Sequence, residues 1–203
     1  MKTLVLKVII LLCVVFCLVG IIPASASSLF NTHKYDLYFY KYSKHYFGPS
    51  FDYKWFKAQG IAESGLNQQA TSPVGAVGVM QVMPTTAKEI RSKQVFILDI
   101  KNNPEWNIAA GIYYDRYLWG NWKARRSFED RLRFMFASYN AGLGSILKVQ
   151  EKCVVTENTC NCNNWDCILQ YKTYNTRWKH EETIPYVDRI FKYYYELNMF
   201  TNK

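Results

Sequence analysis

Residues 61–84 are IAESGLNQQATSPVGAVGVMQVMP, and this stretch indicates where one helix ends and a loop begins. It holds one charged side chain, Glu63, and no other Asp, Glu, Lys or Arg follows until Lys88. Gly65, directly after the Glu-Ser pair, is typical of a residue that ends a helix. The glycines beyond it are typical of a loop. The stretch therefore predicts a helix that ends beside a lone carboxylate, followed by a glycine-rich loop.

An ionised acid at position 63 is expected to destabilise its helix. It lies in the last turn of the expected helix, where the negative end of the helix dipole disfavours a second negative charge. Trp55, Phe56 and Ile61 supply apolar neighbours, and both effects raise the pKa of a carboxyl group. A carboxylic acid with a raised pKa can protonate the leaving oxygen of a glycosidic bond. Glu63 is therefore the candidate catalytic residue, and a solvated glutamate at a helix end is the alternative.

The loop after Glu63 has the composition of a binding segment for an uncharged ligand. Gly75 and Gly78 allow the backbone to approach a ligand closely and to expose its N–H and C=O groups. Ser72, Gln81 and Met83 add side chains without charge. These groups suit a neutral, hydroxyl-rich polymer, and the glycine patterns that bind phosphate or dinucleotides are absent. A tight structural turn would use the same glycines.

Helical periodicity dominates the rest of the chain. Apolar and aromatic residues recur at spacings of three and four. The expected helical segments are 35–46, 53–64, 86–90, 107–119, 128–140 and 185–198. No stretch alternates convincingly as a strand does. The fold class predicted is all-α, a single helical domain with at most a minor β-ribbon.

The N-terminal segment has the pattern of a secretory signal peptide. Lys2 and Lys7 precede an apolar run, residues 8–22, and Ala24-Ser25-Ala26 resembles a cleavage site. We expect cleavage after Ala26, which leaves residues 27–203 as the mature domain. An uncleaved N-terminal anchor is the alternative. The formal net charge of +9 suits an anionic surface, polymer or membrane. Export argues against nucleic acid as the partner.

Four cysteines of the expected mature chain lie close together, at Cys153, Cys160, Cys162 and Cys167. In an oxidising compartment such a group predicts two disulfides. Two pairings are open: 153–160 with 162–167, or 153–162 with 160–167. A zinc site is a further alternative, although the paired C-x-x-C spacing that zinc favours is absent. The expected role is to hold an irregular cysteine-bearing loop at about 151–180.

Four motifs occur in order between residues 63 and 190. They are Glu63-Ser64-Gly65, then GVMQVMP at 78–84, ASYNAG at 137–142 and ETIPYVDRI at 182–190. Together they closely resemble the motifs of bacterial lytic transglycosylases of the soluble type, enzymes of lysozyme-like fold that cleave peptidoglycan. Val79 and Val82 stand where the family has Leu, and the cysteine-bearing segment resembles an insertion.

The resemblance implies roles for individual residues and needs no cofactor and no metal. Glu63 corresponds to the single general acid and base, and Tyr186 to the tyrosine that faces it. The other implied substrate-binding residues are Ser72, Gln81, Met83, Tyr139 and Asn140. The implied architecture is a lysozyme-like helical domain with a substrate cleft.

The implied activity is that of a lytic murein transglycosylase, a carbon-oxygen lyase. It cleaves the β-1,4 bond from N-acetylmuramic acid to N-acetylglucosamine and leaves 1,6-anhydromuramic ends. The alternatives are a hydrolytic muramidase on the same fold and a non-catalytic glycan-binding component of an envelope machine. The expected partner is the glycan strand of peptidoglycan, with an envelope-spanning secretion or conjugation complex as a further candidate. The expected location is the periplasm or cell envelope of a bacterium.

Overall fold

The computed structural model describes residues 30–94, 97–156 and 161–201. The expected signal peptide, residues 1–26, lies outside the described residues, so its prediction stays untested. The chain divides into two units, Met1–Thr32 and His33–Lys203, and all helices named below belong to the second. Within the described ranges, no helix combines the length and the apolar character that a membrane crossing requires.

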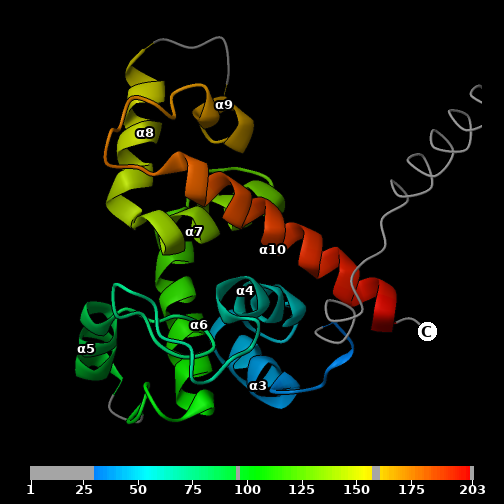
Figure 1. Ribbon diagram of the computed structural model, residues 1–203. Coiled ribbons are helices and arrows are strands. Elements are labelled where there is room, and N and C mark those ends of the chain that lie inside the picture. Colours follow the sequence, from blue (N-terminus) through cyan, green and yellow to red (C-terminus); the bar gives the residue numbers. More distant parts are fainter. Residues whose placement is uncertain (1–29, 95–96, 157–160, 202–203) are drawn as a thin grey trace, which may run out of the picture. The chain divides into compact units, whose positions relative to one another are not determined.

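The second unit is built from helices, which confirms the predicted all-α class (Figure 1). The helices are α3 (Asp36–Phe47), α4 (Lys54–Ser64), α5 (Pro84–Lys93), α6 (Pro104–Asn121), α7 (Phe128–Ala141), α8 (Leu143–Val155), α9 (Trp165–Leu169) and α10 (His180–Thr201). In place of a β-ribbon, the described residues contain two isolated antiparallel bridges, Thr71 to Val77 and Val77 to Val82. Both bridges lie in the loop between α4 and α5.

Local sequence explains both ends of α4. Asp52 Oδ1 accepts a hydrogen bond from the Lys54 backbone N–H at 3.0 Å, which satisfies one of the free donors at the helix start. Gly65 follows the last turn with φ of 63° and donates its N–H to the Ile61 carbonyl. This left-handed conformation strains other residues and suits glycine. Glu63 is therefore fixed in the last turn of α4, as predicted.

Helix α4 is enclosed by its neighbours. Helix α10 packs along α4 and α7, while α3 packs against α4 and α6 (Figure 1). Trp55 of α4 stacks on Tyr194 of α10 with ring centroids 3.6 Å apart. Trp55 and Phe56 are buried, and so is the polar side chain of Gln59. Because α4 is enclosed, the helix that carries Glu63 is part of the core.

The cysteine-bearing segment is more ordered than an irregular loop. Of the expected loop at about 151–180, residues 151–155 belong to α8, and Trp165–Leu169 form α9. Trp165 is buried beside Phe134 of α7, and its backbone N–H donates to Asp130 Oδ1 at 2.8 Å. The segment after Asn161 is therefore held against α7 by apolar packing and a hydrogen bond.

A disulfide joins Cys153 of α8 to Cys162. This rules out the predicted pairing of 153–160 with 162–167 and agrees with one bridge of the other pairing. The second bridge of that pairing needs Cys160, which lies outside the described residues. The sulfurs of Cys153, Cys162 and Cys167 lie within 4.8 Å of one another. Because zinc is bound by thiolates, two sulfurs joined in a disulfide do not suit the zinc alternative.

Helix α10 begins five residues earlier than the expected start at Pro185. Its first turn carries Glu181 and Glu182, acids that the positive end of a helix dipole stabilises. Proline is unfavourable beyond the first turn of a helix, so the sequence indicated a start at Pro185. The earlier start places Thr183 and Tyr186 one turn apart on the same helix.

Candidate active site

The centre of the site is a short hydrogen bond between α10 and α4. The Tyr186 hydroxyl donates to Glu63 Oε1 at 2.5 Å. Tyr186 is buried, with 3% of its surface exposed, while Glu63 keeps partial exposure. A group that donates or accepts a proton needs this combination of a fixed side chain and access to a ligand.

Burial raises the pKa of Glu63 to about 7, and two smaller effects oppose the rise. The Tyr186 hydrogen bond and the positive charge of Arg189 both lower the pKa, because they stabilise the ionised carboxylate. No ion pair includes Glu63 among the residues that the structure describes. Glu63 is therefore half protonated near neutral pH, where it can act as an acid and then as a base.

Two hydrogen bonds tie the loop after Glu63 to the helices beside it. The Ser64 hydroxyl, next to Glu63, donates to the Val79 carbonyl at 2.8 Å. The Tyr139 hydroxyl of α7 donates to the Met80 carbonyl, also at 2.8 Å. The predicted site residue Tyr139 therefore anchors the loop backbone to α7.

Asn107 of α6 holds the same loop from another side. Its Oδ1 accepts from the Met80 backbone N–H at 2.8 Å, and its Nδ2 donates to the carbonyls of Val77 and Ile100, each at 2.9 Å. Gly78 lies directly against this amide with φ of 76°, and a Cβ there would come within 2.4 Å of Asn107 Nδ2. The glycine at position 78 is therefore required by the close approach of Asn107.

A further hydrogen bond connects α10 to α7. The Thr183 hydroxyl donates to Asn140 Oδ1 at 2.8 Å. Thr183 is buried, whereas Asn140 is exposed. With this bond, the four sequence motifs form one network: the first contacts the second and the fourth, and the third contacts the second and the fourth.

Three predicted binding residues have contacts within their own loop. The Ser72 hydroxyl accepts from the Ala76 N–H at 3.0 Å. Gln81 has φ of 44°, and its amide donates to the carbonyls of Ala70 and Gly78. Met83 is 38% exposed at the start of α5. These contacts shape the loop, and a substrate-binding role for the three residues stays a prediction.

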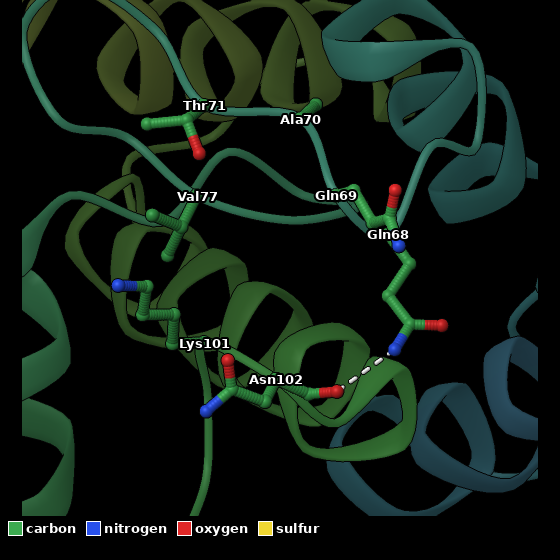
Figure 2. Close-up of a pocket in the computed structure, with 7 residues that line it drawn as sticks. All are labelled: Gln68, Gln69, Ala70, Thr71, Val77, Lys101 and Asn102. Carbon is green, nitrogen blue, oxygen red and sulfur yellow. Dashed lines mark hydrogen bonds between the residues drawn. The ribbon is translucent and has the colours of Figure 1, made fainter.

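The cavity in Figure 2 lies between the loop after α4 and the residues just before α6, and its lining does not include the candidate acid. It has a volume of about 370 Å³. Its lining residues are Gln68, Gln69, Ala70, Thr71, Val77, Lys101 and Asn102. The Gln68 amide donates to the Asn102 carbonyl at 2.8 Å and closes one side of the cavity. A substrate cleft beside Glu63 stays a prediction.

Sequence reasoning missed three polar residues behind the site. The sequence indicates Asn107 only as a residue of the predicted helix 107–119. Asp115 of α6 and Gln59 of α4 are both fully buried, and the Gln59 amide donates to Asp115 Oδ1 at 3.4 Å. A polar residue inside an amphipathic helix pattern gives no sign of a partner that is 56 residues away. The one available indication was that Gln59 precedes Glu63 by one helical turn.

Comparison with known families covers the first three of the four motifs. Residues 49–156 match the model of the Transglycosylase SLT domain. The chain belongs to this family. The match includes Glu63, the loop after it and the ASYNAG motif, and it ends before the segment that carries Cys160, Cys162 and Cys167.

Curated relatives of this SLT-domain chain include two membrane-bound lytic murein transglycosylases F. One, from Haemophilus influenzae, is 28% identical over 154 residues, and one, from Histophilus somni, is 30% identical over 153 residues. Each alignment covers 70% of this chain and 30% of the relative. The chain therefore spans less than a third of the length of these relatives.

Solved structures show the same fold as this SLT-domain chain. The 70 kDa soluble lytic transglycosylase in complex with bulgecin A matches with a TM-score of 0.63 and 24% identity, over 83% of this chain and 25% of that one. An inactive mutant of the lytic transglycosylase Slt from Pseudomonas aeruginosa matches with a TM-score of 0.62 and 23% identity. The match covers 82% of this chain and 24% of that one. These similarities confirm the predicted lysozyme-like fold.

Proposed function

We propose that this SLT-domain protein is a peptidoglycan lytic transglycosylase with Glu63 as its general acid and base. The observation that carries the proposal is the Glu63–Tyr186 contact within the network of all four motifs. The pKa of about 7 supports it, since a catalytic acid works best when its pKa lies near the working pH. The names of the curated relatives, lytic murein transglycosylases, point to the same substrate.

The proposed reaction uses one carboxyl group twice. Glu63 first donates its proton to the oxygen between N-acetylmuramic acid and N-acetylglucosamine, and the bond from C1 to that oxygen breaks. The N-acetyl group of the muramic acid acts as the internal nucleophile, as in substrate-assisted glycosidases. The Glu63 carboxylate then takes the proton of the C6 hydroxyl. The C6 oxygen bonds to C1 as the bond from C1 to the acetamido oxygen breaks, so a 1,6-anhydro ring forms, the N-acetyl group is restored, and no water is consumed.

The Tyr186 hydroxyl contributes to both halves of this cycle. Burial and the charge of Glu63 raise the pKa of Tyr186 well above its ordinary value, so the hydroxyl keeps its proton. A protonated hydroxyl holds Glu63 in one position and stabilises the carboxylate after proton donation. The attacking C6 hydroxyl belongs to the same sugar, which gives it a high effective concentration.

Digestion of purified peptidoglycan in water enriched with heavy oxygen tests the proposed function. We expect products with anhydromuramic ends that carry no heavy oxygen from the solvent. Reducing ends that carry the label would identify a hydrolytic muramidase instead. Glycan binding without any new ends would identify a non-catalytic module. Either of these results would overturn the proposal.

We also propose that the protein acts outside the cytoplasm, in the cell envelope where peptidoglycan lies. The basic start, apolar run and Ala-Ser-Ala pattern of residues 1–26 support export. The disulfide between Cys153 and Cys162 supports an oxidising compartment. N-terminal sequencing of the protein from cell fractions tests this: Ser27 at the N-terminus is the expected result, and an intact Met1 in the cytoplasm would contradict it.

A further inference from the structure

A second carboxyl group lies behind the candidate acid. Asp115 of α6 has no exposed surface, and its partner Gln59 lies on α4 one turn before Glu63. Gln59 Nε2 donates to Asp115 Oδ1 at 3.4 Å. Substrate cannot reach a fully buried side chain, so Asp115 is not the second catalytic carboxylate of a two-acid glycosidase.

Two atoms of this pair lack a hydrogen-bond partner. Asp115 Oδ2 and Gln59 Oε1 are both buried and unpaired. An ionised carboxylate and an amide oxygen are both acceptors, so neither can satisfy the other. A single proton on Oδ2 changes this, because it supplies the donor that Oε1 lacks. Buried polar atoms without partners are costly, so the geometry favours the protonated acid.

The surroundings of Asp115 also oppose a charge. Among the residues that the structure describes, the ionisable groups that interact with it are Glu63 of α4, Tyr114 of α6, Tyr139 of α7 and Tyr186 of α10, and none of these four is a cation. Burial, followed by the negative charge of Glu63, raises the pKa of Asp115 well above its ordinary value, and the Gln59 hydrogen bond opposes this rise. An ionised Asp115 would place a second negative charge behind the carboxyl that must ionise during catalysis.

We propose that Asp115 stays protonated in the folded protein and exchanges two hydrogen bonds with Gln59, forming an uncharged pair that positions α6 behind Glu63. Asp115 is a positioning residue. By staying neutral, it leaves Glu63 as the carboxyl that gains and loses the proton within the group of Glu63, Asp115, Tyr139 and Tyr186. The catalytic part of this inference rests on the proposed function, whereas the protonation of Asp115 does not.

Infrared spectroscopy detects the proton directly. The comparison uses the Glu63→Gln protein, which lacks the other carboxyl of the group, and the Glu63→Gln/Asp115→Asn protein. At about pH 8, where ordinary carboxyl groups are ionised, we expect the carbonyl band of a protonated acid in the first protein and its loss in the second. Absence of the band from the first protein, or its persistence in the second, would overturn the proposal.

The pH dependence of stability gives an independent test. The folded pKa of Asp115 is raised, so its contribution to stability is full below its ordinary pKa and is lost as pH rises towards the folded pKa. Asparagine keeps both hydrogen bonds and never ionises. The ratio of the folding equilibrium constant of Asp115→Asn to that of the wild type should therefore rise about tenfold per pH unit from about pH 4 upwards. A constant ratio would contradict a protonated Asp115.

Two matched variants separate this effect from general changes in the fold. Asp188→Asn removes an exposed carboxylate that pairs with Arg133, and it is the control for loss of a carboxyl group outside the site. Asp115→Leu leaves the Gln59 amide unpaired, so it should lower both stability and activity, and Asp115→Asn should restore both relative to the leucine variant. Equal losses in the leucine and asparagine variants would contradict the paired arrangement.

The activity profile tests the link to Glu63. If Asp115 is neutral in the wild type, Asp115→Asn should not change the pH at which activity falls to half its maximum on the alkaline side. If Asp115 were ionised, its charge would raise the pKa of Glu63, and the asparagine variant would shift this point to lower pH. Failure of the enzymatic proposal would leave this experiment without activity to follow, while the infrared and stability results would still decide the state of Asp115.

Discussion

Glu63 and Tyr186 show how distant parts of the chain form the environment of the candidate acid. The two residues are 123 positions apart, and a hydrogen bond of 2.5 Å joins them. From the sequence, position at a helix end and apolar neighbours predicted a raised pKa for Glu63, and the structure gives about 7, with burial as the largest cause. The local sequence indicated the direction, but the extent of burial depends on the packing of other helices around α4.

Removal of the Tyr186 hydroxyl should shift the activity profile to higher pH. The hydrogen bond from Tyr186 lowers the pKa of Glu63, so Tyr186→Phe should raise it above about 7. A hydrogen bond to a charged group contributes about 1.5–3 kcal/mol, which corresponds to about one to two pH units. The measurement is the alkaline limb of the rate of peptidoglycan solubilisation against pH.

Tyr194→Phe is the matched control, because the Tyr194 hydroxyl donates its hydrogen bond to Asp52 Oδ2, at 3.0 Å, and not to Glu63. It should leave the alkaline limb in place. A shift of the limb to lower pH in Tyr186→Phe, or equal shifts in both variants, would contradict the assigned role of Tyr186.

Replacement of Glu63 by Gln should stabilise the protein at neutral and alkaline pH. The folded pKa of about 7 lies above the ordinary value of 4.5, so the stability associated with Glu63 is full below about pH 4.5 and is lost as pH rises through about 7. Above this window, Glu63→Gln should be more stable than wild type by up to about 3 kcal/mol. Chemical denaturation at several pH values measures the difference, and equal stability at all pH values would contradict the raised pKa.

The loop between α4 and α5 depends on contacts from other helices. The sequence predicted it as a glycine-rich segment, and Gly78 is indeed a position where a side chain would collide with Asn107. The sequence did not reveal Asn107 as the support, because a polar residue near a helix start resembles an ordinary solvated or capping residue. The hydrogen bonds to Val77 and Met80 span 27 to 30 positions, a separation that local patterns do not report.

Asn107→Ala should loosen this loop and reduce activity. It leaves one backbone N–H and two carbonyls without their partner, at a cost of about 1–3 kcal/mol for each buried unpaired group. We expect faster hydrogen exchange at the Met80 amide and a lower kcat/KM. Asn121→Ala removes an exposed side-chain contact at the end of the same helix and is the control. Unchanged exchange at Met80 in Asn107→Ala would contradict the role of Asn107.

Helix boundaries were predicted well where caps or breakers are local and less well elsewhere. The ends of α4 follow from Asp52 and Gly65. Helix α8 was not predicted: its N-cap is Gly142, which has φ of 82° and offers no side-chain cap. Its buried residues, Ile146, Val149 and Cys153, contact the rest of the molecule. Its stability therefore comes from tertiary packing, which a local pattern represents poorly.

The whole domain explains why a helix end can hold a buried acid. Helix α10 packs on α4 and α7, and α3 packs on α4 and α6, so the environment of Glu63 forms only when these helices meet (Figure 1). The all-α class and the family could be predicted from the sequence, because periodicity and the four motifs are properties of the chain itself. The paired Asp115 and Gln59 could not, because their hydrogen bond joins α4 to α6 and exists only in the folded protein.

The disulfide should stabilise the cysteine-bearing segment without changing the acid. Cys162→Ser removes the bridge from Cys153, which closes a loop of nine positions, and should lower the free energy of unfolding by about 2–3 kcal/mol. The pKa of Glu63 should stay the same, because neither cysteine contributes to it. Thermal unfolding and the activity profile measure both quantities. A shifted profile with unchanged stability would contradict this assignment.

Mass spectrometry of peptidoglycan digests most directly tests the central claim, that Glu63 is the acid and base of a lytic transglycosylase. Three proteins are compared: wild type, Glu63→Gln, and Glu89→Gln as an exposed control on α5. The account predicts muropeptides with 1,6-anhydromuramic ends from wild type and the control, and their loss from Glu63→Gln. Anhydromuramic ends from Glu63→Gln at the wild-type rate, or none from wild type, would contradict it.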